Sequence, residues 1–201
     1  MKKILLTVVT ACVFQMTTAV AYADCMNSDP FYWQGTRRLS SYDKLMQFMQ
    51  CRDYGDKIEN ALSDRTACNW FVARALQALF NINDFAPEGG QGWRDANTIA
   101  SEIGASSHWT KIGDASSQAT LQSAADAAAA GDAVVAIEPG DTHGHVAIIL
   151  AGPLTASGSW SLKVPNSASF RLDSVDKTFV GCKLSFAWQK PDGVAIFKRV
   201  K

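Results

Sequence analysis

The sequence predicts an α+β fold, because helical and strand patterns occupy different halves of the chain. Before Gly131, apolar residues recur at helical spacing in three segments, 67–80, 94–103 and 118–130. After Gly131 the pattern changes to short β-rich runs separated by glycine, proline, serine or aspartate, at 134–137, 146–150, 160–164, 170–172 and 194–197. Helices that precede strands in this way favour N-terminal helices packed on one face of a mainly antiparallel sheet. Further short helices are expected from Ser40 and near Ile58 and Leu62.

The chain begins with a pattern typical of a secretory signal peptide. Two lysines precede an apolar stretch from Ile4 to Phe14, and a small-residue segment then ends in Ala21-Tyr22-Ala23. Cleavage after Ala23 would separate residues 1–23 from a single domain of residues 24–201, which is long enough to form a core. The apolar stretch is too short for a good membrane span. We therefore expect a periplasmic or secreted protein without stable membrane insertion.

Four cysteines would remain after cleavage, Cys25, Cys51, Cys68 and Cys182. In an oxidising compartment four cysteines most simply form two disulfides, and Cys68 would then be structural. If Cys68 is instead a nucleophile, one of the other three stays unpaired. Cys25–Cys51 is then the preferred pair, because it would tie down the N-terminal arm. A lipoprotein acylated at Cys25 is disfavoured by Asp24, since a small residue is wanted just before such a cysteine.

The charge of the chain gives no indication of a nucleic-acid or membrane partner. Basic and acidic residues number 19 each, and no run of lysines or arginines stands out. Proteins that bind nucleic acid usually carry a basic patch or stripe. We therefore expect neither a nucleic-acid partner nor an anionic membrane surface as a partner.

Cys68 lies at the predicted start of the strongest helix, where Asp64 or Thr66 is placed to act as the N-cap. The unpaired backbone N–H groups and the positive end of the helix dipole stabilise a thiolate at such a position. Because the thiolate is the reactive form of cysteine, Cys68 is the candidate nucleophile.

A cysteine nucleophile needs a base, and the sequence has three histidines. His145 opens the apolar run that follows it, so a strand would hold it rigidly, and we prefer it as the base. His143 lies nearer the turn and remains the alternative, since positions 143 and 145 share a side if both lie in the strand. His108 stands in a polar loop and is expected at the surface. Gly144 would let the substrate or the Cys68 helix approach closely.

A catalytic imidazole also needs an orienting partner on its second nitrogen. Asn166 follows the predicted strand 160–164 and is a candidate, although it equally fits a turn residue after Pro165. Asp173 is a weaker alternative. A zinc site built from His143, His145 and a cysteine lacks the C-x-x-C or H-E-x-x-H spacing, so we expect no metal and no other cofactor.

Three motifs in order resemble those of cell-wall amidases. Thr66-Ala67-Cys68-Asn69-Trp70-Phe71-Val72-Ala73 resembles the nucleophile motif of CHAP-type amidases, where a cysteine opens a helix and aromatic residues follow. Gly144-His145-Val146-Ala147-Ile148-Ile149 is similar to the strand that delivers the histidine in CHAP and NlpC-type hydrolases, and Gly131-Asp132-Ala133-Val134-Val135 resembles the strand before it. The resemblance covers roughly residues 64–170 and implies a papain-like, NlpC-type fold.

The chain departs from this family at two positions. Family members often carry glutamine just before the cysteine, where this chain has Ala67, so the oxyanion hole would rely on the Cys68 backbone N–H. Members also often place an acid on the strand after the histidine, and Val164-Pro165-Asn166-Ser167 offers none. Asn166 would make the site more like that of papain.

The resemblance implies cleavage of amide bonds in peptidoglycan stem peptides through a thioester acyl-enzyme. Cys68 would attack the carbonyl, and His145 would protonate the leaving amine. The biological role would be that of a housekeeping wall hydrolase or of an antibacterial amidase toxin, which would have an immunity protein as partner. Two alternatives remain: a secreted papain-like protease acting on proteins, and a non-catalytic binding domain with Cys68 in a structural disulfide.

Overall fold

The computed structural model describes Leu45 and residues 67–85, 94–171 and 178–200. The predicted signal peptide, the two short helices before residue 66, the caps Asp64 and Thr66 and the alternative Asp173 lie outside the described residues. Leu45 itself is helical and fully buried. No helix in these described ranges has the length and apolar character needed to cross a membrane.

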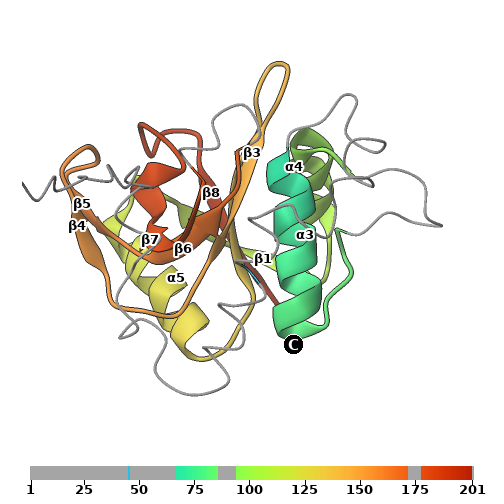
Figure 1. Cartoon of the computed structure of the whole chain (residues 1–201), viewed down its shortest axis with the longest axis horizontal. Helices are drawn as coiled ribbons and strands as arrows, with labels where there is room; N and C mark the ends of the chain where they lie inside the picture. Colours follow the sequence, from blue (N-terminus) through green and yellow to red (C-terminus); the bar gives the residue numbers. More distant parts are fainter. Residues whose placement is uncertain (1–44, 46–66, 86–93, 172–177, 201) are drawn as a thin grey trace, which may run out of the picture.

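The described chain folds into helices on both sides of a β-sheet (Figure 1). The α-helices are α3 (Ala67–Phe80), α4 (Ala96–Ala105) and α5 (Gln118–Ala129). The main sheet contains β1 (Trp109–Asp114), β2 (Val134–Glu138), β3 (His145–Ile149), β6 (Asn166–Ser169), β7 (Phe179–Lys183) and β8 (Ala195–Arg199). Two short strands, β4 (Thr155–Ser157) and β5 (Leu162–Val164), pair separately, and a 3-10 turn, η4 (Leu184–Phe186), follows β7.

The six-stranded sheet has the order β1-β8-β2-β3-β6-β7, and every neighbouring pair is antiparallel. The prediction of a mixed helix-and-sheet fold with a mainly antiparallel sheet is therefore confirmed. In this order β3 lies in the interior of the sheet, between β2 and β6. A residue at the start of β3 can therefore meet side chains from both neighbouring strands.

Side-chain alternation divides the core into two layers. Val146 and Ile148 of β3 pack with α3 and α4, and Ala147 and Ile149 pack with α5 on the other face. On the first face, Phe71 of α3 stacks on Phe170 with ring centroids 6.4 Å apart. Burial of a side chain of this size stabilises the fold by about 1.5–3 kcal/mol. The expectation that the helices share one face is corrected for α5, whose leucine and alanines fill the opposite layer.

Sequence patterns located the three helices and several strands but missed others, and only for β6 is a weak composition the reason. Helix α3 has the predicted bounds, and α5 ends as predicted before Gly131, which adopts a φ of +86°. Strands β1 and β7 were not predicted, and the run at 170–172 is replaced by β6. The sequence of β6, Asn-Ser-Ala-Ser, contains no β-branched or aromatic residue, so composition gave no signal for it.

Candidate active site

Cys68 lies in the first turn of α3, as predicted, and it carries a thiol that is not in a disulfide. Its backbone N–H is one of the first four in the helix, which have no acceptor within the helix. The side chain is only 1% exposed and packs in the core layer that also contains Trp70 and Val146. Burial disfavours a thiolate and the helix start favours one. A positively charged partner would therefore be needed to hold the thiolate form.

Cys182 of β7 is disulfide-bonded, and its partner lies outside the described residues. Cys25 and Cys51, the preferred pair, lie outside the described residues, so that pairing stays a prediction. The thiol at Cys68 also removes the basis of the alternative in which this residue forms a structural disulfide.

His145 is the first residue of β3, and its imidazole is held from two sides. Its Nε2 lies 2.7 Å from Oγ of Ser169 on the neighbouring strand β6. Its ring meets the Trp188 ring edge to face, with centroids 5.0 Å apart. The β3–β6 ladder pairs Ile148 with Ala168, so its continuation sets Ser169 beside Ala147, on the same face as His145. Such diagonal neighbours are within reach of a long side chain.

Asn166 does not orient His145, and this prediction is corrected. Its Nδ2 donates to the carbonyl of Ala151 over 3.0 Å, and its own carbonyl accepts from Leu150 N over 2.8 Å. Asn166 opens β6, and because β6 runs antiparallel to β3, it meets the end of β3 rather than the start. The strand predicted at 160–164 is β5, which pairs separately with β4, and β6 begins only after Pro165.

Ser169 was missed at the sequence level for a specific reason. It is fully buried, but a serine in an Asn-Ser-Ala-Ser segment reads as part of a loop. The one available signal was the spacing of Ser167 and Ser169, which lie two residues apart on either side of Ala168. On a strand, residues two apart share a face.

The other two histidines lie away from this arrangement. His143 is exposed and precedes the first residue of β3, so the strand does not hold it. His108 is exposed, as predicted for a surface loop. Nowhere in the described ranges do three histidine, cysteine or acidic side chains gather as metal ligands would.

The turn between β2 and β3 is fixed by the start of α4. Asn97 donates from Nδ2 to the Gly140 carbonyl over 2.8 Å and accepts from Gly140 N over 2.9 Å. A Cβ on Gly144 would lie 2.6 Å from Asn97 Oδ1 and 2.7 Å from the Glu138 carbonyl oxygen. Gly144 thus permits a close approach, as predicted, but the neighbour is α4 rather than the Cys68 helix.

Glu138 is a further ionisable group beside His145, and no sequence pattern singled it out. The two residues are direct partners in the β2–β3 ladder. Burial raises the pKa of the Glu138 carboxyl above its usual value, and the nearby Trp188 indole only partly offsets this. A Cβ on Gly193 would lie 3.2 Å from Glu138 Oε1, so the carboxyl is enclosed on that side as well. Trp188 therefore contacts the His145 ring and also lies near the partly enclosed Glu138 carboxyl.

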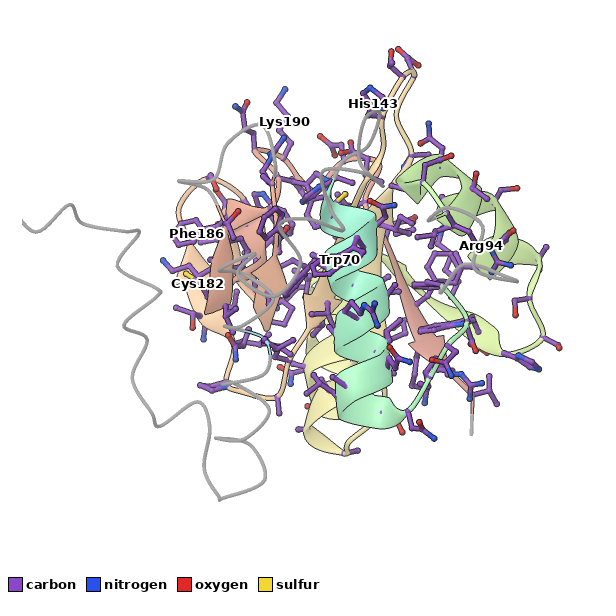
Figure 2. All side chains as sticks on the ribbon, turned by 45° about the vertical axis from the view of Figure 1, so that its right-hand side comes forward. Trp70, Arg94, His143, Cys182, Phe186 and Lys190 are labelled. Carbon is purple, nitrogen blue, oxygen red and sulfur yellow. The ribbon has the colours of Figure 1, made fainter. Side chains whose placement is uncertain are left out.

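Cys68 and His145 belong to two different layers that meet at one end of the sheet. Cys68 packs with Val146 on the α3 face, whereas the described partners of His145, Ser169 and Trp188, lie on the other face. The start of α3 and the start of β3 nevertheless lie at the same end of the molecule (Figure 1). Figure 2 shows His143, in the turn before β3, beyond this end of α3. Cys68 and His145 therefore come from elements that begin at the same end of the sheet but on opposite faces of it.

Comparison of the sequence with models of known protein families gives no match, and a search of curated proteins gives none either.

Proposed function

We propose that this protein is an exported papain-like cysteine hydrolase in which Cys68 is the nucleophile and His145 is its base. The observation that carries the proposal is the anchoring of His145, whose Nε2 is held by the buried Ser169 and whose ring contacts Trp188. A histidine fixed in this way on a rigid strand, at the same end as a helix that begins with a thiol, has the parts of a nucleophile and base pair. The helix dipole supports the thiolate form.

The reaction proposed for Cys68 and His145 is acyl transfer. Nδ1 of His145 takes the proton from the Cys68 thiol, and the thiolate attacks an amide carbonyl. The Cys68 backbone N–H, in the first turn of α3, stabilises the oxyanion. The imidazolium then gives its proton to the departing amine, which leaves a thioester on Cys68. The same imidazole takes a proton from water, and the resulting hydroxide releases the acid and restores the thiol.

Peptidoglycan stem peptides are the substrate class that we propose. Two observations support it: the export signal pattern at residues 1–23, and the motif resemblance over residues 64–170 to CHAP and NlpC-type wall hydrolases. A housekeeping role and a toxin role with an immunity partner both fit this chemistry. Hydrolysis of ordinary proteins is the competing outcome that the test below separates.

The test is digestion of purified peptidoglycan by the wild-type protein, Cys68→Ala and His145→Ala, with products identified by mass spectrometry. Casein serves as the parallel substrate. Release of stem-peptide fragments by the wild type and not by either variant supports the proposal and identifies the bond. Cleavage of casein alone shifts the substrate to proteins. If the wild type cuts neither and iodoacetamide labels Cys68 no faster than an ordinary thiol, the hydrolase proposal is wrong.

A further inference from the structure

We propose that Ser169 is the positioning residue of His145 and takes the place that papain-like enzymes give to an amide or a carboxylate. This inference rests on the proposed function and adds the third member of its site. The pair is defined by the 2.7 Å contact between Ser169 Oγ and His145 Nε2. With Nε2 engaged by Ser169, Nδ1 is the ring nitrogen that exchanges a proton with the Cys68 thiol.

The surroundings of Ser169 strengthen this bond. Ser169 is fully buried, and Trp188, which contacts the same imidazole, is 7% exposed. The Ser169 side of the Oγ–Nε2 bond is thereby shielded from water, and a hydrogen bond in a low-dielectric site is electrostatically stronger than one in water. The hydrogen bond and the ring contact together fix both the direction and the tilt of the imidazole.

Ser167 shows what an ordinary buried serine does on the same strand. It is also fully buried, lies on the same face of β6, and donates its hydroxyl to the Cys182 carbonyl over 3.0 Å. Ser169 differs, because its side-chain hydrogen bond within the described part of the chain goes to an imidazole rather than to the backbone. The Ser167 hydroxyl donates to a backbone carbonyl of the sheet, whereas the Ser169 hydroxyl contacts the proposed base.

A hydroxyl gives the site a property that a carboxylate lacks. Serine both donates and accepts, whereas an ionised carboxylate only accepts. When His145 carries its proton on Nε2, Ser169 accepts it in a hydrogen bond and leaves Nδ1 basic toward the thiol. After Nδ1 takes the thiol proton, Nε2–H still donates to the same oxygen. Ser169 therefore keeps the ring oriented through the proton transfer without adding a negative charge beside the imidazolium.

The test compares Ser169→Ala with Ser167→Ala, which removes the same hydroxyl from the same strand face at equal burial. Alkylation of Cys68 by iodoacetamide is followed by mass spectrometry across pH, and kcat and KM are measured on peptidoglycan. We expect Ser169→Ala to change the pH profile of alkylation and to lower kcat by about 10- to 100-fold, with KM changed less than about twofold. Ser169→Thr, which keeps the hydroxyl, should restore the profile, and Ser167→Ala should keep it.

The outcomes separate this proposal from the proposed function. If His145→Ala changes the alkylation profile of Cys68 and Ser169→Ala does not, the role of Ser169 is wrong while the Cys68–His145 pair stands. If His145→Ala also leaves the profile unchanged, the pair itself is wrong and both proposals fall. Equal effects of Ser169→Ala and Ser167→Ala on the profile would reduce Ser169 to a structural residue.

Discussion

The Trp188 ring lies edge to face against the His145 ring, with centroids 5.0 Å apart and planes at 72°. Trp188 is itself held in place, because the indole N–H of Trp160 donates to its carbonyl over 3.1 Å. Aromatic pairs of this geometry contribute about 0.5–1.5 kcal/mol beyond the area that they bury. Trp188 thus couples the packing of the α5 layer to the orientation of the proposed base.

Trp188→Phe should lower hydrolase activity more than it lowers stability. The variant keeps an aromatic ring but fills less of the space over His145, so we expect kcat to fall several-fold while the fold is retained. Trp109→Phe is the matched control, because Trp109 is also buried and directs its indole N–H at a carboxylate, that of Asp84, over 2.9 Å. Measurement of kcat and of the thermal unfolding temperature for both variants tests this prediction. Equal losses of kcat would contradict a specific role of Trp188.

Glu138→Gln should make stability less dependent on pH in the mildly acidic range. Burial raises the pKa of this carboxyl above its usual 4.5, so the folded state binds a proton before the unfolded state does. Wild-type stability therefore gains a contribution as the pH falls from neutral through the raised pKa toward 4.5, where the gain is complete. Glutamine removes this gain.

The size of the Glu138 effect should be within about 1 kcal/mol, since the carboxyl is only partly enclosed. Urea unfolding of wild type and Glu138→Gln at several pH values measures it. Identical pH slopes in the two proteins would show that Glu138 ionises normally in the folded state.

Gly144→Ala should disturb the turn that presents His145. Its new Cβ would meet Asn97 Oδ1 at 2.6 Å and the Glu138 carbonyl oxygen at 2.7 Å, so the start of α4 and the β2–β3 turn must separate. We expect a loss of about 1–3 kcal/mol in the free energy of unfolding together with lower activity. Gly158→Ala is the control, because nothing lies within 4 Å of its Cβ position. Equal stability of the two variants would contradict this close packing.

Two residues of the proposed site stand where the sequence placed them, because local patterns define their elements. Apolar spacing defines α3 and its start, where Cys68 lies, and His145 opens a run of buried residues. Those patterns depend on neighbours in sequence. They therefore hold even where the pairing of strands is unknown.

The rest of the site depends on strand register, which no local pattern records. Asn166 and Ser169 lie three positions apart on β6, and the antiparallel pairing with β3 alone decides which one meets His145. Trp188 meets the imidazole from the segment between η4 and β8, and Glu138 is the partner of His145 in the β2–β3 ladder. Asn166 was therefore expected at the wrong end of the strand, and Ser169, which contacts His145, lies in a segment without a β-rich sequence.

Asp84→Asn should destabilise the fold at neutral pH, and the loss should disappear in acid. Asp84 accepts hydrogen bonds from Trp109 Nε1 and Arg199 Nε, both over 2.9 Å, which join the segment after α3 to β1 and β8. Burial alone would raise the pKa of this carboxyl, but the hydrogen bonds from Arg199 and Trp109 and the charge of Arg199 hold it below 3.8. The ionised form is therefore the one that stabilises the folded state.

A lowered pKa means that the Asp84 contribution is complete above 3.8, the usual value, and is lost as the pH falls through the lower value of the folded state. Asparagine should cost about 1–3 kcal/mol in the free energy of unfolding at pH 7, because it leaves the buried part of the Arg199 pair unsatisfied. Asp114→Asn is the control, since its ion pair with Lys111 is exposed and such pairs contribute about 0–1 kcal/mol. Chemical unfolding at pH 7 and below pH 3.8 tests both variants. A deficit of Asp84→Asn that persists unchanged in acid would show that the lost hydrogen bonds matter and the charge does not.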